Sequence, residues 1–168
     1  LEEKRHTLAH LLAAAVLERY PHAKATIGPA IDTSFYYDFD FAGGKAPGEV
    51  ELAELQASME ELLPSWSDMS GTEVSEADAR DRFKGNQYKL EILDGITAAS
   101  DIITLYTAGN FTDLCRGGHC DHPAHEIRVG TFELERIAGA YWRGDEKNPM
   151  LTRIYGLAFD TKEELEAY

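Results

Sequence analysis

The stretch SFYYDFDF, residues 34–41, alternates between large aromatic residues and a second set of more polar positions. Phe35, Tyr37, Phe39 and Phe41 fall on one face of an extended chain, and the residues between them fall on the other face. The alternation predicts a β-strand that buries its aromatic face.

Further strand patterns are concentrated in the second half of the chain. Residues 102–107, 111–114, 137–142 and 151–159 are rich in β-branched and aromatic residues, with Gly, Asn, Asp and Pro between them. Because these segments follow one another without long helical patterns between them, we expect an α+β fold with a largely antiparallel sheet.

Helical patterns lie on both sides of the first strand. Residues 4–20 are rich in Ala and Leu without Gly or Pro, and residues 47–62 begin with Pro47 and repeat Leu and Met at helical spacing. Ser75 is expected to cap a short acidic helix. Residues 88–93 are too short for their periodicity to decide between helix and strand.

The end of the chain has the pattern of a helix start. Thr161 precedes an acidic run and is typical of an N-cap. We therefore expect residues 1–160 to form one domain and residues 161–168 to begin a linker helix. The chain is interpreted as a piece of a longer protein.

Composition limits the classes of function. The 168 residues are 43% hydrophobic, which is enough for one sizeable core, and no apolar run approaches the roughly 20 residues needed to span a bilayer. We expect a soluble, cytoplasmic protein without a membrane partner, in which Cys115 and Cys120 are reduced thiols. The net charge of −14 argues against tight binding of nucleic-acid phosphates by this chain alone.

Two short-spaced pairs of side chains are candidates for chemistry. His6 and His10 are one helical turn apart and point to the same side, and Cys115 and His119 are equally spaced in a Gly-rich turn. Together they match the ligand types of a tetrahedral zinc site, and also of a hydrolytic site built from the same side chains. A histidine pair at this spacing is by itself more often a core or interfacial pair, and spacing does not show that the two pairs meet.

The set His6-x-x-x-His10 and Cys115-x-x-x-His119 resembles the signature of the second, editing-associated domain shared by threonyl- and alanyl-tRNA synthetases and free-standing alanyl editing proteins. Further segments resemble the threonyl branch, and with them the resemblance covers nearly the whole chain. They are IGPAID at 27–32, FYYD at 35–38, FTDLCRG at 111–117, AGAYWRGD at 138–145 and MLTRIYG at 150–156.

The resemblance implies a two-layer α+β domain with a cleft over its sheet, where the 3′ end of tRNA(Thr) carrying serine is bound and Ser-tRNA(Thr) is hydrolysed. The remaining domains of a parent synthetase would supply most of the tRNA affinity. Seven residues match functional positions of the family. The catalytic residues would be His6, Lys89, Asp113 and Cys115, and the substrate-binding residues would be Tyr37, His10 and His119.

Hydrolysis of an aminoacyl ester requires a positioned water and a stabilised oxyanion. We expect His6 to place or deprotonate the water, Lys89 to stabilise the negative charge, Asp113 to bind the α-ammonium or orient a water, and Tyr37 to bond the seryl hydroxyl. Without the resemblance, Lys89 would be interpreted as solvated and Asp113 as a turn residue. Cys115 is expected first as a pocket wall, then as a zinc ligand and last as a nucleophile.

Two other functions stay open. One is a non-catalytic, zinc-stabilised module that binds the tRNA acceptor end, and the other is an alanyl-type editing hydrolase, which the segment 138–155 disfavours. Alanyl-type relatives hold zinc at the four signature positions, whereas for the threonyl branch we expect catalysis that requires no cofactor. If Zn²⁺ is present, its ligands would be His6, His10, Cys115 and His119.

This sequence departs from the family pattern beside the Cys115 to His119 turn. Gly118 stands where the family has a Pro, which predicts a looser turn or one with a different path. Cys120, His122 and His125 add a thiol and two imidazoles near the site. We expect them to be solvated loop residues rather than metal ligands.

Overall fold

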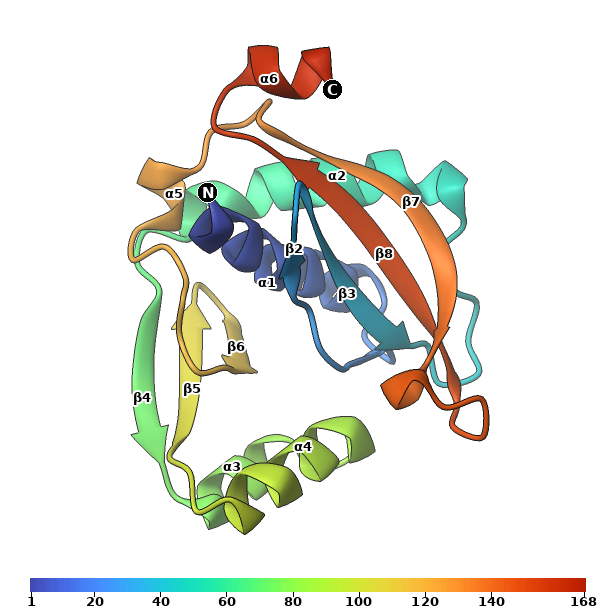
Figure 1. Ribbon diagram of the computed structural model, residues 1–168, viewed down its shortest axis with the longest axis vertical. Helices are drawn as coiled ribbons and strands as arrows, with labels where there is room; N and C mark the ends of the chain where they lie inside the picture. Colours follow the sequence, from blue (N-terminus) through green and yellow to red (C-terminus); the bar gives the residue numbers. More distant parts are fainter.

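The computed structural model describes residues 1–168 and contains two antiparallel sheets with helices packed against them (Figure 1). The elements are, in chain order, α1 (Glu2–Arg19), β1 (Lys24–Ala25), β2 (Ala30–Ile31), β3 (Ser34–Asp40), η1 (Glu49–Glu51), α2 (Leu52–Leu62), η2 (Leu63–Ser65), β4 (Ser70–Val74), α3 (Glu76–Arg82), α4 (Gln87–Ala98), β5 (Ile103–Ala108), β6 (Phe111–Leu114), α5 (Pro123–Glu126), β7 (Phe132–Tyr141), η3 (Trp142–Gly144), β8 (Met150–Ala158) and α6 (Lys162–Ala167).

The strands form two sheets, so the α+β class with antiparallel pairing is confirmed, but the expectation of a single sheet is wrong. The larger sheet has the order β1-β3-β8-β7, with β2 also paired to β3, and the smaller one has the order β4-β5-β6. Strand β4, Ser70–Val74, was not predicted from the sequence. Its first four residues are exposed, and it shows no alternation of apolar residues. Because β4 and β6 both pair with β5, the segments around residues 102–114 belong to the second sheet.

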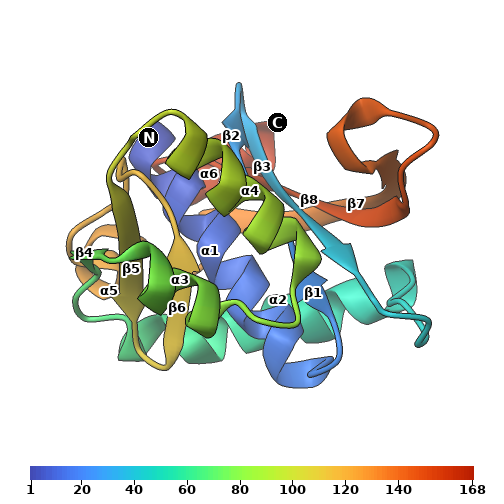
Figure 2. The same ribbon diagram turned by 90° about the horizontal axis from the view of Figure 1, so that it is seen from below.

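The main core lies between the larger sheet and two helices. Helices α1 and α2 contact β3 and β7 on one side of this sheet, as both views show (Figure 2). Phe35, Tyr37 and Phe39 are fully buried there, which confirms the aromatic face of the first strand. On the opposite face Asp38 is also buried, because Arg153 on β8 donates two hydrogen bonds to its carboxylate, at 2.8 and 3.0 Å.

The smaller sheet has its own, much smaller core. Ala79 on α3, Leu93 on α4 and Ile103 on β5 form a cluster of three buried residues. The segment 88–93, whose type the sequence left undecided, is part of α4. Its N-cap is Asn86, whose side-chain oxygen accepts hydrogen bonds from the amides of Tyr88 and Lys89.

Several helix boundaries test the capping arguments. Ser75 caps α3 and Thr161 caps α6, each accepting a hydrogen bond from an amide three residues on, at 3.1 Å, so both predicted caps are confirmed. Pro47 as the first helical residue is wrong, because Gly48 is extended and α2 begins only at Leu52. None of the helices has the length and apolar character that a membrane crossing needs.

Candidate active site

The predicted site residues come together at the junction of the two sheets. A pocket of about 230 Å³ is lined by side chains from α1, β3, α4 and β6 together with the loop before β2. Six of the seven predicted residues line it, and they are His6, His10, Tyr37, Lys89, Asp113 and Cys115. The seventh, His119, contacts His10 from the neighbouring loop. The cleft therefore lies between two sheets and α1, not over one sheet as expected.

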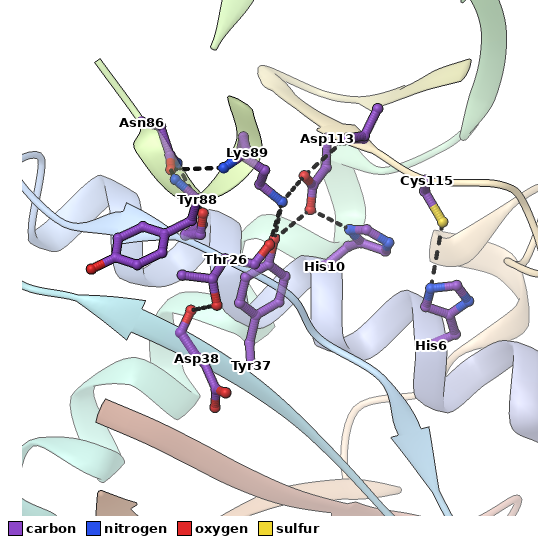
Figure 3. A network of polar contacts seen from close by, with 12 residues as sticks. His6, His10, Thr26, Tyr37, Asp38, Asn86, Tyr88, Lys89, Asp113 and Cys115 are labelled. Atoms are coloured by element: carbon purple, nitrogen blue, oxygen red, sulfur yellow. Dashed lines mark hydrogen bonds and ion pairs between the residues drawn. The ribbon is translucent and has the colours of Figure 1, made fainter. Parts of the chain in front are cut away.

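Asp113 is the centre of a buried hydrogen-bond network (Figure 3). Its Oδ1 accepts from Lys89 Nζ at 2.6 Å and from the Leu114 amide at 2.8 Å, and its Oδ2 accepts from Tyr37 Oη at 2.6 Å and from His10 Nδ1 at 2.9 Å. Burial alone would raise the pKa of Asp113, but the charges and hydrogen bonds of Lys89 and His10 hold it well below its usual range. The carboxylate is therefore ionised with four donors around it.

Lys89 is fully enclosed, so the interpretation of it as a solvated lysine is wrong. Its side chain is 4% exposed, and Nζ donates to the Thr26 carbonyl at 2.7 Å, to Tyr37 Oη at 2.9 Å and to Asp113. These three acceptors use all three ammonium hydrogens. Because Lys89 lies in the first turn of α4, the position of this helix decides where the ammonium group lies.

His10 connects the buried network to the other histidines. Its Nδ1 donates to Asp113, and its Nε2 shares a hydrogen bond with His119 Nε2 at 3.2 Å. Burial alone would lower the pKa of His10, but the interactions with Asp113 and Cys115 outweigh burial and raise it to about 9. The carboxylate fixes the ring so that Nε2 points toward the other signature residues.

The remaining signature residues make fewer and longer contacts. Cys115 Sγ lies 3.5 Å from His6 Nε2 and 3.6 Å from the Gly117 carbonyl, and the buried His119 Nδ1 has no hydrogen-bond partner. Burial would raise the pKa of the Cys115 thiol, but the imidazoles of His10, His119 and His6 outweigh it and lower the pKa to about 4. This side of the pocket holds a thiolate among three imidazoles.

The same four residues fit a metal ion by type and spacing. One donor atom from each of His6, His10, Cys115 and His119 lies within 4.8 Å of all the others. The Sγ to Nε2 separation of 3.5 Å lies within the roughly 3.3–3.8 Å between ligand atoms on a tetrahedral zinc ion, and the Nε2 to Nε2 separation of 3.2 Å is just below it. A zinc-binding histidine commonly donates the N–H of its other ring nitrogen to a carboxylate, as His10 does to Asp113.

The residues that depart from the family pattern lie in different environments, and not all of them are where the sequence predicted. Gly118 has φ of 86°, which a Pro cannot adopt, so the turn follows a path that the usual residue would not allow. His122 and His125 are exposed as expected, and His122 bonds to Asp68 at 2.8 Å. Cys120 as a solvated residue is wrong, because it is 2% exposed and belongs to the main core.

Sequence reasoning missed part of the pocket. The Thr26 carbonyl accepts from Lys89, Ile92 lines the wall one turn after Lys89, and Gly28 supports Tyr37. A Cβ at Gly28 would lie 2.2 Å from the Tyr37 ring, so a larger residue would displace that ring. The only available signals were the Gly28-Pro29 pair and Asn86 as a helix cap.

Comparison with known proteins agrees with this geometry. Residues 103–155 match the model of the threonyl and alanyl tRNA synthetase second additional domain. Over its whole length the chain is similar to threonine–tRNA ligases. It is 48% identical to those of Francisella philomiragia and Dehalococcoides mccartyi, and 45% identical to that of Borrelia hermsii. The predicted resemblance is thereby confirmed. The chain spans 26–28% of these relatives.

Proposed function

We infer that this chain hydrolyses mischarged Ser-tRNA(Thr) to serine and tRNA(Thr), as the editing domain of a cytoplasmic threonine–tRNA ligase. The observation that carries this proposal is the meeting of His6, Cys115 and the buried Lys89–Asp113 pair around one pocket. The partners would be the acceptor end of tRNA(Thr) and the remaining domains of the ligase. Similarity of the whole chain to threonine–tRNA ligases supports this assignment over an alanyl-type hydrolase.

Hydrolysis of an aminoacyl ester needs a positioned water and a stabilised oxyanion, and the pocket contains residues for both roles. His6 is half-buried and lines the pocket, so it can hold and deprotonate a water. Lys89 has no free hydrogen, so in this proposal it stabilises the oxyanion through its charge. The four donors around Asp113 make it a positioning residue for Lys89, Tyr37 and His10, which replaces the direct substrate contact expected from the sequence.

Selectivity must come from one methyl group. A synthetic site that accepts threonine discriminates against serine by only about 1–3 kcal/mol, so a second pocket that excludes the larger side chain is needed. Cys115 is the proposed wall against the methyl group, and Tyr37 is the proposed partner of the hydroxyl group.

The test is deacylation of two esters by the full-length ligase. We expect Ser-tRNA(Thr) to be hydrolysed at least about tenfold faster than Thr-tRNA(Thr). His6→Ala and Lys89→Ala should each lower deacylation by roughly 10² while leaving threonine activation intact. His122→Ala is the matched control, because His122 is exposed and bonds only outside the pocket. Equal hydrolysis of both esters by the unaltered protein would contradict the proposal.

A second candidate is a zinc-stabilised module that binds the acceptor end without turnover, and the spacing of the four ligand atoms favours it. His6, His10, Cys115 and His119 would hold the ion, which would supply Lewis-acid chemistry or structural support. Protein that binds the acceptor end and contains zinc, but does not hydrolyse Ser-tRNA(Thr), would establish this alternative.

A further inference from the structure

The turn between β7 and β8 contains Trp142-Arg143-Gly144-Asp145, which lies outside the pocket. The turn is closed by hydrogen bonds from the Trp142 amide to the Pro149 carbonyl at 3.0 Å and from the Asn148 side chain to the Trp142 carbonyl at 2.8 Å. Arg143 and Gly144 have φ of 56° and 69°. A left-handed Arg is uncommon, so this sequence builds one particular turn at some conformational cost.

This turn contacts helix α4 through one carboxylate. Trp142 Nε1 donates a hydrogen bond to Glu91 Oε2, and Arg143 Nε donates to the same oxygen at 3.1 Å. The Trp142 ring also meets the Tyr88 ring edge-on, with centroids 5.1 Å apart, and Leu151 completes a buried cluster with them. The side chains of Trp142, Arg143 and Glu91 are called the α4 clamp below.

The clamp acts on the face of the helix next to the one that lines the pocket. Successive residues of a helix are about 100° apart, so Tyr88 and Glu91 share one face, whereas Lys89 and Ile92 share another. The first pair meets the turn and the second pair lines the pocket, while Ile92 also packs against the cluster of Tyr88, Trp142 and Leu151. Fixing Glu91 from outside therefore fixes the rotation of α4 that directs Lys89 inward. Tyr88 adds a further attachment, since its hydroxyl donates to Asp40 on β3 at 2.6 Å.

We propose that the α4 clamp is a positioning device that sets Lys89 against Asp113 and Tyr37, with Trp142 and Glu91 as its positioning residues. The helix packs on the smaller sheet through a core of only three buried residues, and the start of the helix is bonded to the larger sheet by Asn86 to the Ala25 carbonyl at 2.9 Å and by Tyr88 to Asp40. Lys89, in contrast, must reach acceptors on β3 and β6 and in the loop after β1. The clamp adds a bond to the β7–β8 turn at Glu91, so the helix is held to the larger sheet on both sides of Lys89 along the chain.

The direct test measures the reactivity of Lys89 in the full-length protein, with the acetyl ester of N-hydroxysuccinimide as the amine reagent and peptide mass spectrometry as the readout. Exposed Lys147 in the same turn is the internal reference. We expect Glu91→Ala to raise acetylation of Lys89 about tenfold, because it removes the shared acceptor of two donors. Trp142→Phe keeps an aromatic ring against Tyr88 but loses the N–H and part of the indole surface, so we expect a rise of about threefold.

Two variants separate positioning from a general loss of structure. Glu91→Gln keeps an oxygen that accepts the indole hydrogen and should stay within about twofold of the unaltered protein. The double variant Trp142→Phe/Glu91→Ala should react like Glu91→Ala alone, because both changes break the same contact. Glu146→Ala, which changes an exposed acidic residue of the same turn, is the matched control and should leave acetylation of Lys89 at the level of the unaltered protein. Unchanged Lys89 reactivity in Glu91→Ala would overturn the clamp, as would an equal rise in Glu146→Ala.

A kinetic readout rests on the proposed function and is separate from the labelling result. In hydrolysis of Ser-tRNA(Thr), Glu91→Ala should lower kcat about tenfold with little change in KM. In a Lys89→Ala background the same change should lower kcat no further, whereas a purely structural role would lower it in both backgrounds. A full further decrease there would also overturn the clamp. If the unaltered protein does not hydrolyse the ester, the proposed function fails and the labelling result alone decides the clamp.

Discussion

The two halves of the pocket differ in how completely their polar atoms are bonded. In the inner half, Asp113, Lys89, Tyr37 and His10 are joined by hydrogen bonds of 2.6–2.9 Å and are almost fully buried. In the outer half, Cys115 makes contacts of 3.5 and 3.6 Å, and a buried nitrogen of His119 has no partner. The inner half is therefore prearranged by the protein, whereas the outer half keeps bonding capacity for a substrate or a metal ion.

The comparison predicts that the inner half is costly to alter. We expect Asp113→Ala to lower the free energy of unfolding by about 3–5 kcal/mol, because it leaves the buried Lys89 and His10 without their carboxylate. Urea denaturation measures this change. Asp101→Ala is the control, since its pair with Arg116 is largely exposed and should be worth less than about 1 kcal/mol. Similar losses in both variants would remove the distinction.

A smaller decrease in the free energy of unfolding is expected where a substitution removes only a hydroxyl group. Tyr37→Phe keeps the ring but deletes one donor to Asp113 and one acceptor of Lys89, and should cost about 1.5–3 kcal/mol. Tyr36→Phe makes the same change one residue earlier, where the side chain is half-exposed, and should stay within about 0.5 kcal/mol. A Tyr37→Phe protein as stable as Tyr36→Phe would mean that the network is not tightly coupled.

Substitutions in the outer half should affect stability less than they affect the selectivity between the two esters. Cys115→Ala is expected to cost less than Asp113→Ala, because the thiolate is partly exposed and its contacts are long. If Cys115 is a wall, the preference for Ser-tRNA(Thr) over Thr-tRNA(Thr) should narrow, with Cys120→Ala as a control that leaves the ratio unchanged. Loss of both hydrolytic activities in Cys115→Ala would instead identify a ligand or a nucleophile.

The smallest change in the free energy of unfolding is expected when a chelator removes metal ions. We expect purified protein to contain less than one zinc ion per chain, and its free energy of unfolding to change by less than about 0.5 kcal/mol in a chelating buffer. A metal ion present at about 100 times its Kd would contribute about 2.7 kcal/mol, so the two cases are well separated. One tightly held ion per chain, absent from Cys115→Ala, would assign the outer half to a metal ion.

The four signature residues could be predicted from the sequence more readily than the buried network around Asp113. His6 and His10 share a helix face because of their spacing, and the Cys115 to His119 turn has the same interval, so local rules and the family pattern were enough to group them. The buried state of Lys89 followed from no local rule. Its three acceptors come from Thr26, Tyr37 and Asp113, which only the tertiary fold brings together.

The same distinction applies to the fold. The aromatic alternation of residues 34–41 and the caps at Ser75 and Thr161 are local signals, and the elements that they predict are present. Strand β4 is exposed over most of its length, so it lacks the apolar pattern by which strands are recognised. Without that strand, the division into two sheets could not be predicted.

The site joins residues that are far apart in the chain, and this has a consequence for the order of folding. His10 bonds to Asp113, 103 positions later. At about 5–20 residues per second, a ribosome needs roughly 5–20 s to add that length. Leu8, Leu11 and Leu12 on α1 are fully buried in the finished fold, and the main partners of this helix, β3 and α2, are made well before β6. A newly made chain can therefore cover the apolar side of α1 seconds before the carboxylate that bonds to His10 exists.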